Sequence, residues 1–285
     1  MPELPEVETT VRGLRKKVLN LSILDVWTDL KTKDPRKKDT VADPKYFPVF
    51  KKEIKNKKII SVERVAKNIL INLSGSPAKT ILIHMKLTGY LFYGKDPKIK
   101  FAHVIFSLSN KHYLVFSDMR KFGKITLLDT KEAHETKHLK GIGPDPLSKE
   151  FTLEKLKEVL NKKPNGKIKT VLLDQSIIAG IGNIYSDEIL WYAGIHPERK
   201  ISQIKPEEFK KLHKFIKEVL QKGINFGGDS MSDYRNINGL PGEFQLQHQA
   251  YQRTGEKCRK KGCGGVIIRK VINNRSAHFC AKHQK

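Results

Sequence analysis

Cysteine is scarce in this chain of 285 residues, and long apolar runs are absent. Only Cys258, Cys263 and Cys280 occur, an odd number confined to the C-terminal tail, which argues against a disulfide framework. No stretch of roughly 18 apolar residues exists, and the N-terminus lacks both a basic region and a continuous apolar region. We therefore expect neither secretion nor membrane spanning, and a cytoplasmic protein.

Acidic residues are also few, since 30 Asp and Glu stand against 55 Lys and Arg, for a formal net charge of +25. This charge favours a polyanionic partner, and a ribosomal protein, a membrane-surface binder and a nucleic-acid enzyme all fit it. Apolar segments such as VLLDQSIIAGIGNIYSDEILWYAGI indicate more buried structure than a basic tail needs. With 38% hydrophobic residues, the chain is expected to be a globular nucleic-acid-binding protein of two domains.

The first half of the chain has a helical start followed by strand patterns. Val7, Val11, Leu14 and Val18 recur at helical spacing and predict a leading amphipathic helix. Residues 21–128 then consist mostly of short β-branched or aromatic runs separated by Gly, Asn, Asp and Pro. Such runs predict a β-sandwich or barrel.

The second half changes in character after KGIGPDPLSKE, whose glycines and prolines are typical of a linker. Helices are predicted at about 150–161, 167–177, 183–193 and 206–222. The stretch from Gly223 to Gly242 is rich in glycine and weakly patterned, so we expect a mobile loop there.

The three cysteines form a metal-ligand pattern with one histidine. Four residues separate Cys258 from Cys263, and Cys280 and His283 follow as a second pair. This set suits one tetrahedral Zn²⁺ ion, and because it leaves no open position for a substrate water, the ion is expected to be structural. An Asn-Asn turn signal between the pairs indicates that the metal staples a small β-hairpin. Three buried thiols and an unrelated surface histidine are the alternative.

Two further clusters suggest contacts to a nucleic acid. In LLDQSIIAGIGNIYSDEIL a Gly-Ile-Gly turn joins two predicted helices, and Asn183 is placed to cap the second, which leaves backbone N–H groups suited to a phosphate. A plain helical hairpin is the alternative, but nearby Lys163 and Lys169 favour the DNA backbone. In SDMRKFG, Arg120 and Phe122 share one face of an extended segment and predict a wedge that enters a base stack. Phe122 alone would be an ordinary core residue.

The opening stretch MPELPEVETT predicts a nucleophile at the chain terminus. After removal of Met1, Pro2 carries a secondary amine, and a terminal amine with a pKa near 8 is about 20% neutral at about pH 7.4, against about 0.1% for an ordinary lysine. Attack on C1′ of a deoxyribose gives a cationic iminium, an electron sink for β-elimination. Glu3 is close enough to pass a proton to the sugar, and Glu6 would hold the amine. A frayed tail whose acids cap a helix is the alternative.

Six motifs are spread over the whole chain, namely PELPEVETTVRG, VAKNILINL, ILIHMKLTGYL, SDMRKFG, LLDQSIIAGIGNIYSDEILWYAGIHP and the Cys/His tail. In this order they resemble the bacterial formamidopyrimidine-DNA glycosylase family. The resemblance implies a monomeric, nucleoid-associated enzyme of base excision repair whose partner is damaged double-stranded DNA. Such an enzyme flips an oxidised purine, either 8-oxoguanine or a formamidopyrimidine, out of the duplex, cuts the glycosidic bond and nicks the strand by β,δ-elimination as an AP lyase.

The same resemblance implies the fold. We expect an α+β protein with an N-terminal β-sandwich and a leading helix, then a C-terminal helix-two-turn-helix bundle and a zinc-stapled β-hairpin. The expected divisions are a catalytic sandwich domain at 1–138, a linker at 139–149, a helix-two-turn-helix DNA-binding domain with a mobile lesion loop at 150–244, and a zinc finger at 245–285.

Single positions of the chain match functional positions of the family. Pro2 matches the Schiff-base nucleophile and Glu3 the proton donor, while Lys67 matches the lysine assigned to β-elimination. Arg275 matches the zinc-finger arginine assigned to δ-elimination. The residues expected to contact DNA are Glu6, His84, Leu87, His103, Arg120, Phe122, Lys163, Lys169 and Asn183.

The chain departs from the family pattern in several places. Leu87 stands at the position of a methionine in the family's wedge, and we expect the wedge to persist because the two side chains are similar in volume. Phe101 replaces the first histidine of a His-x-His pair, so His103 alone remains. The first cysteine pair is widened and the last zinc ligand is a histidine, which reshapes the knuckle but keeps a normal Cys₃His set. The loop after Gly227 and Gly228 lacks the family's lysine.

Two rival functions remain open. One is an endonuclease VIII-like glycosylase for oxidised pyrimidines, although such enzymes begin PEGPE and this chain reads PELPE. The other is a noncatalytic module that binds damaged DNA and keeps the fold without the chemistry. Whether the loop at 226–242 reads the flipped base is also open.

Overall fold

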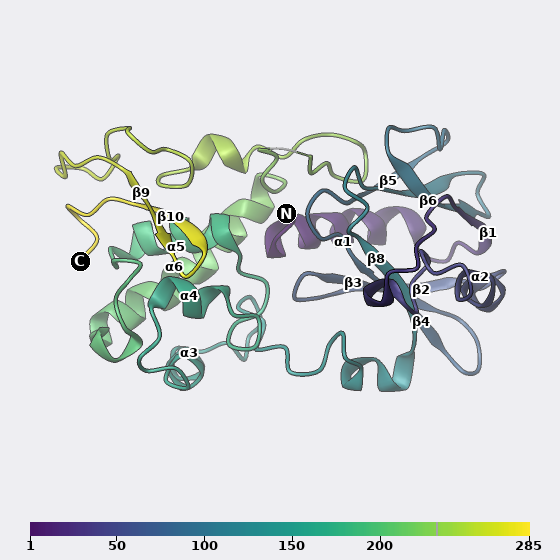
Figure 1. Ribbon diagram of the computed structural model, residues 1–285, viewed down its shortest axis with the longest axis horizontal. Coiled ribbons are helices and arrows are strands. Elements are labelled where there is room, and N and C mark those ends of the chain that lie inside the picture. The colour runs from purple at the N-terminus through teal and green to yellow at the C-terminus, as the bar shows by residue number, and fades with distance from the viewer. Residues whose placement is uncertain (232) are drawn as a thin grey trace. The chain divides into compact units, whose positions relative to one another are not determined.

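The computed structural model describes residues 1–231 and 233–285. The chain forms two compact units, shown in Figure 1: unit 1 contains Met1–Lys140 and Phe226–Glu243, and unit 2 contains Gly141–Asn225 and Phe244–Lys285. The sequence analysis assigns 226–243 to the second domain, whereas the structure gives this segment its contacts in unit 1. The unit boundary after Lys140 falls inside the segment expected to be a linker.

Unit 1 is built on two four-stranded sheets. One has the order β2–β3–β4–β8, with strands Ile59–Val65, Asn68–Leu73, Lys79–His84 and Lys124–Asp129. The other has the order β1–β6–β7–β5, with strands Ile23–Thr28, Ala102–Leu108, Tyr113–Ser117 and Tyr90–Gly94. All neighbouring strands are antiparallel. All eight strands lie within residues 21–129, so the predicted β-rich segment is confirmed.

Helix α1 (Leu4–Val18) begins the chain and packs on β2 and β3. Val7, Val11, Leu14 and Val18 are all fully buried, so the predicted amphipathic helix is confirmed. Its first turn carries an acidic residue and its last turn basic residues, and these charges stabilise the helix by their interaction with its dipole. The helix runs beside the strands of unit 1, with the N-terminus of the chain at one of its ends (Figure 1).

The core of unit 1 lies between the inner faces of the two sheets. Val104 and Phe116 from one sheet join Ile69 and Ile83 from the other in one buried cluster. Burial of each such side chain contributes about 1.5–3 kcal/mol relative to an exposed one. A second helix, α2 (Phe47–Ile54), closes one side with two buried residues and is absent from the sequence prediction.

Unit 2 is mainly helical. Its helices are α3 (Leu153–Leu160), α4 (Ile168–Leu173), α5 (Asn183–Ala193) and α6 (Pro206–Asn225). Helix α5 packs against both α4 and α6. The four predicted helices are present, but α6 runs through Asn225, so the loop predicted from Gly223 begins later than expected. Among the described residues, no helix is long and apolar enough to cross a membrane.

A small antiparallel hairpin ends the chain in unit 2. It consists of β9 (Ile268–Ile272) and β10 (Arg275–Phe279), and β10 contacts α5. Asn273 and Asn274 both have positive φ, 45° and 62°, as the predicted two-residue turn requires. The α+β fold class, with its sandwich, helices and C-terminal hairpin, is thereby confirmed.

Candidate functional site

The N-terminal end of α1 gathers buried acidic groups. Pro2 is buried, and the exposed fractions of Glu3 and Glu6 are only 2% and 1%. The Glu6 Oε2 atom accepts the backbone N–H of Glu3 at 2.7 Å, and the Glu3 side chain accepts the backbone N–H of Glu6. The second Glu6 oxygen, Oε1, accepts the backbone N–H of Asp229 at 2.7 Å. The first residues of the chain are thus held in one place by the capping interactions of a carboxylate pair.

The glycine pair after α6 lies against Glu6. Gly228 has φ +89°, and a Cβ atom there would stand 3.0 Å from Glu6 Cγ and 2.9 Å from the ring of Tyr234. The Tyr234 hydroxyl donates to the Glu6 carbonyl at 3.0 Å, and burial raises its pKa. The predicted lesion loop therefore starts with a close backbone approach to α1. Its residue Ser232 lies outside the described residues.

Lys67 is brought to the same end of unit 1. It lies in the turn between β2 and β3, directly after Ala66, which has a left-handed backbone with φ 54°. The Lys67 side chain is 7% exposed, and burial lowers its pKa, while the carboxylates of Glu3 and Glu6 raise it by a smaller amount. Three of the predicted catalytic and binding residues are thus electrostatically coupled, and a lysine of lowered basicity is suited to proton transfer.

His84 ends β4, opposite Asn68 on β3. Its Nδ1 atom accepts the backbone N–H of Lys86 at 3.0 Å. Burial lowers the pKa of His84 to about 3, and the charges of Lys86, Lys67 and Lys124 add to this effect. A neutral imidazole with Nδ1 occupied as an acceptor carries its proton on Nε2, so His84 can offer an N–H to an anion.

The turn that carries Arg120 and Phe122 is organised by Asp118. Asp118 Oδ2 accepts the backbone N–H of Gly123 at 2.7 Å, and Oδ1 accepts the hydroxyl of Thr88. Thr88 in turn accepts the backbone N–H of Arg120 at 3.1 Å. The guanidinium carbon of Arg120 lies 4.9 Å from the centre of the Phe122 ring, which is 45% exposed. The predicted wedge residues therefore form one exposed pair.

Thr88 and Asp118 are site residues that the sequence analysis missed. Thr88 follows Leu87, the half-buried third member of the predicted wedge, so one hydroxyl–carboxylate bond ties the two wedge loops together. Both loops also contain a left-handed residue other than glycine, Lys86 with φ 57° and Lys121 with φ 54°. An aspartate two positions before the arginine is the signal that was available in the sequence.

Two residues predicted to contact DNA are buried in the structure. His103 is only 6% exposed, and its Nδ1 atom lies 2.8 Å from Asp29 Oδ1. Lys169 is fully buried, with its Nζ atom 2.7 Å from Asp187 Oδ1 and 2.9 Å from Ser186 Oγ. A buried charge requires such internal partners. Lys169 therefore organises the interior, whereas His103 keeps a buried Nε2 atom that has no hydrogen-bond partner among the described residues, so its contact with DNA stays a prediction.

Asp187 joins the helices of unit 2 to the hairpin. Besides Lys169 on α4, it accepts the backbone N–H of His278 on β10 at 3.0 Å, and His278 Nδ1 lies 3.0 Å from the same oxygen. Arg275 is exposed at the start of β10, immediately after the turn. The buried network thus fixes the strand that presents Arg275.

The prediction that Asn183 caps α5 is wrong. Gly182 is the N-cap residue, and Asn183 is the first residue of the helix. The Asn183 Oδ1 atom is buried and accepts no hydrogen bond from the described residues. Lys163, the other predicted backbone contact nearby, forms an ion pair with Asp174.

The predicted metal ligands come together. One ligand atom from each of Cys258, Cys263, Cys280 and His283 lies within 4.8 Å of all the others. The Nε2–H group of His283 donates to the Trp191 carbonyl at 3.0 Å, which leaves Nδ1, 3.3 Å from Cys258 Sγ, free to bind a metal.

The surroundings of these four residues fit a metal ion. Burial raises the pKa of the Cys280 thiol, but the backbone N–H groups of His283 and Lys282, together with hydrogen bonds from Cys263 and Cys258, outweigh that effect, so its pKa lies below the ordinary value. A Cβ atom on Gly265 would stand 2.6 Å from Cys280 Sγ and 3.1 Å from Cys263 Sγ. The glycine therefore allows the backbone to approach the sulfurs closely, and the residues present fit a tetrahedral cation.

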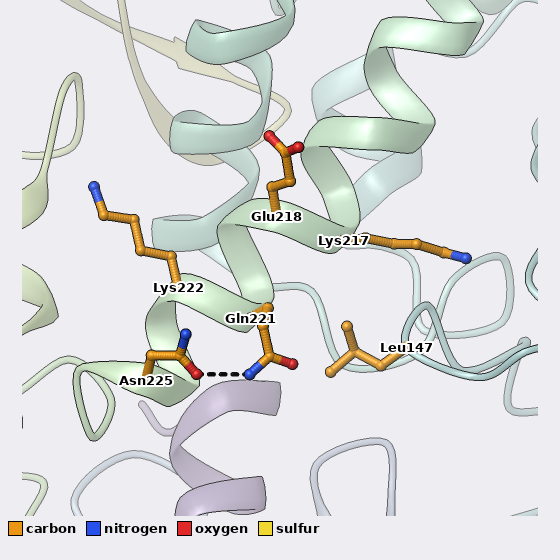
Figure 2. Close-up of a pocket in the computed structure, with 6 residues that line it drawn as sticks. All are labelled: Leu147, Lys217, Glu218, Gln221, Lys222 and Asn225. Carbon is orange, nitrogen blue, oxygen red and sulfur yellow. Dashed lines mark hydrogen bonds between the residues drawn. The ribbon is translucent and has the colours of Figure 1, made fainter.

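A separate open cavity of about 480 Å³ lies in unit 2 along α6. Its lining, drawn in Figure 2, consists of Leu147, Lys217, Glu218, Gln221, Lys222 and Asn225. The amide of Gln221 donates to Asn225 Oδ1 at 2.7 Å, while the side chain of Lys217 points away from this pair (Figure 2). The cavity contains none of the predicted site residues.

Comparison with known proteins explains this combination of a sandwich, helices and a Cys/His cluster. The formamidopyrimidine-DNA glycosylase N-terminal domain family matches residues 1–125, and the formamidopyrimidine-DNA glycosylase H2TH domain family matches residues 142–235. Both matches define the class of the protein as a DNA glycosylase.

Full-length relatives identify the family. The chain is 41% identical to a formamidopyrimidine-DNA glycosylase of Pelotomaculum thermopropionicum, over 100% of this chain and 99% of the relative, and 37% identical to that of Bacillus subtilis, with the same coverage. A solved complex of the Lactococcus lactis enzyme with DNA containing an abasic site has a TM-score of 0.87 and 32% identity, and covers 99% of both chains. The chain belongs to the formamidopyrimidine-DNA glycosylase family.

Proposed function

We propose that the protein excises oxidised purines, 8-oxoguanine and formamidopyrimidines, from duplex DNA and then nicks the strand at the abasic site. The observation that carries this proposal is the buried group of Pro2, Glu3, Glu6 and Lys67 at the start of α1. Solved relatives with 34% identity are complexes with DNA that contains Fapy-dG or carbocyclic 8-oxo-G, which supports the choice of purine lesions.

In the proposed chemistry Pro2 is the nucleophile. Its neutral nitrogen attacks C1′, the bond to the base breaks with the electron pair leaving on the base, and the proton lost from the nitrogen goes to the departing base. Glu3 gives a proton to the ring oxygen, so the sugar opens to an iminium on Pro2. Loss of a C2′ proton then expels the 3′ phosphate. Lys67, whose pKa burial lowers, is the group we assign to that elimination.

The remaining residues bind the nucleic acid. His84 offers a neutral N–H to a phosphate, and Arg120, Phe122 and Leu87 fill the space that a flipped base leaves. Arg275 is assigned to the second elimination, which releases the 5′ phosphate. Cys258, Cys263, Cys280 and His283 would hold one Zn²⁺ ion, which supplies a cross-link for the hairpin and no reaction step.

Borohydride trapping tests the nucleophile. An 8-oxoguanine duplex should give a covalent adduct with the unaltered protein and none with Pro2→Gly, while Pro5→Ala, a change of the neighbouring proline, should trap normally. Mass spectrometry of the trapping protein should show that Met1 has been removed. Adduct formation by Pro2→Gly, or full activity with Met1 retained, would refute the assignment.

Two substrates separate the rival functions. A duplex carrying an oxidised pyrimidine should be cut slowly or not at all beside the 8-oxoguanine duplex. Cleavage of the pyrimidine lesion alone would favour an endonuclease VIII-like enzyme. Tight lesion binding without any trapped adduct would favour a noncatalytic module.

A further inference from the structure

Three lysines and a histidine of unit 1 gather around Lys124, which lies beside His84. They are Lys37, at the end of the short helix η1 (Pro35–Lys37), Lys86, Lys124 and His138, which follows the short helix η2 (Thr130–Glu135). We call these four residues the Lys124 cluster. Within residues 1–231 and 233–285, none of the four forms an ion pair with a carboxylate.

The backbone holds the cluster in place. Lys124 lies directly opposite His84 in the β4–β8 ladder, so the two side chains are on the same face of the sheet. The backbone N–H of Lys86 donates to His84 Nδ1 at 3.0 Å. Lys37 reaches across from η1, and its Nζ atom donates to the carbonyl of Gly123 at 2.7 Å, beside Lys124. Three distant segments of the sequence therefore converge on one end of the sheet.

Lys37 keeps a donor for a ligand. Its ammonium gives one N–H to Gly123 and a second to the carbonyl of Lys121 at 3.1 Å. A lysine has three such donors, so one remains after both carbonyls are satisfied. The two bonds fix the position of the positive charge.

Like charges act on one another within the cluster. Burial, followed by the charges of Lys124 and Lys86, lowers the pKa of Lys37, and burial followed by Lys124 lowers that of Lys86. Burial and the charges of Lys137, Lys124 and Lys86 lower the pKa of His138. The carboxylates of Asp118 and Asp34 act on the pKa of Lys37 in the opposite direction, and that of Asp39 does so for His138, but the pKa of each group stays lowered. A bound anion would favour the charged form of all four groups.

We propose that the Lys124 cluster binds a phosphodiester of the damaged strand, distinct from the 3′ phosphate expelled in the elimination assigned to Lys67 and from the phosphate assigned to His84. The proposal rests on the function proposed above. From Asn68, beside Lys67, the row of paired residues runs through His84 to Lys124, which is two strand spacings or roughly 10 Å. This separation is longer than a single phosphate group, so the cluster would contact a neighbouring phosphodiester of the same strand. The cluster thus extends the contact along the backbone.

Salt dependence of DNA binding tests the proposal. The affinity for a duplex with an abasic-site analogue would be measured at several salt concentrations for the unaltered protein, Lys86→Ala, Lys124→Ala and Lys52→Ala. Lys52 is an exposed lysine of α2 outside the cluster, so its removal changes the net charge equally. Lys124→Ala should reduce the slope of log K against log salt by about 0.9, and Lys124→Arg should restore it. A slope for Lys124→Ala equal to that of Lys52→Ala would overturn the proposal.

Neutral phosphates locate the contact. Methylphosphonates would be placed one at a time at the four positions on either side of the lesion in the damaged strand. The penalty of Lys124→Ala should disappear when the contacted phosphate is already neutral, and it should remain when any other phosphate is neutralised. An equal penalty at every position would indicate a diffuse charge effect and reject a defined site.

The same variants separate this proposal from the proposed function. Binding of an undamaged duplex requires the phosphate contacts but no chemistry, so the slope change of Lys124→Ala should persist there. Failure of the unaltered protein to trap would refute the glycosylase mechanism and leave the slope result intact. Thermal unfolding of each variant would show that the fold is retained.

Discussion

The carboxylate of Glu6 joins two distant segments of the chain, because it accepts the backbone N–H of Asp229 on Oε1 while Oε2 accepts that of Glu3. Both bonds are 2.7 Å long and shielded from water. Each oxygen of one buried side chain is thus committed, one to the start of α1 and one to the glycine loop. A displacement of the glycine loop would therefore also displace the proposed nucleophile, because both segments are bonded to the same carboxylate.

Glu6→Gln should impair trapping more than it impairs folding. A glutamine presents an NH₂ group to one of the two backbone donors, and an unsatisfied buried donor costs about 1–3 kcal/mol. We expect the trapping rate with 8-oxoguanine duplex to fall by at least about tenfold. Glu8→Gln is the control, since Glu8 pairs with Arg12 and Arg64 on the same helix. Equal trapping rates in the two variants would show that Glu6 does not position the nucleophile.

Gly228→Ala should destabilise unit 1 more than an alanine at another left-handed glycine. The new Cβ atom would meet Tyr234 at 2.9 Å and Glu6 at 3.0 Å, in addition to the strain of φ +89°. Gly141 also has a positive φ, +76°, but a Cβ atom there meets nothing within 4 Å, so Gly141→Ala measures the strain alone, about 1 kcal/mol. We expect urea unfolding to show a larger loss for Gly228→Ala. Equal losses in the free energy of unfolding would show that the loop moves to accommodate the new Cβ atom without a cost.

His84 should make the free energy of unfolding decrease at acidic pH. Its pKa is about 3 in the folded protein against an ordinary 6.5, so the unfolded chain binds the proton more readily. The stability that neutral His84 allows is complete above about pH 6.5 and is lost as the pH falls toward 3, by up to about 2 kcal/mol at pH 5. His84→Gln should flatten this part of the profile, measured by urea unfolding, and exposed His134→Gln should not. Parallel profiles for all three proteins would contradict the buried neutral state.

One tightly bound zinc ion per chain is expected from metal analysis. His283→Cys should retain it, because a four-cysteine set is a normal zinc site, whereas Cys280→Ala should lose it. Loss of the metal should unfold the hairpin and lower the affinity for DNA, since β9 and β10 share only a small apolar cluster. Thermal unfolding with and without a chelator checks the same point. A metal-free protein with unchanged thermal stability would contradict a structural role for zinc.

Local patterns were predictable from the sequence. The buried face of α1 follows from Val7, Val11 and Leu14 at helical spacing, and the hairpin turn follows from two adjacent asparagines, which tolerate positive φ. The metal cluster was predictable because its four ligands lie in two close pairs near one end of the chain. In each case the residues that decide the structure are neighbours in the sequence.

Long-range partners decided the rest. Nothing near Lys169 in the sequence indicates that its charge is neutralised by Asp187 in another helix, so a surface role was predicted for a buried group. The segment at 226–243 was assigned to the wrong neighbours for a similar reason. Its Ile237 enters the core of unit 1 and packs against Gly13, more than two hundred residues earlier. Such pairings depend on the tertiary fold and leave no periodic signal.

Ala66, Lys86 and Lys121 each turn a loop of the proposed DNA surface through a left-handed conformation that glycine adopts more readily. Glycine at any of the three would relax local backbone strain, of about 1 kcal/mol or more, and would also widen the range of shapes that the loop explores. A screen for thermal stability alone is therefore expected to select glycine at these positions, although the more flexible loops would lower the turnover rate of the enzyme. A more thermostable variant of this protein should therefore keep Ala66, Lys86 and Lys121 and should be stabilised by substitutions at other positions.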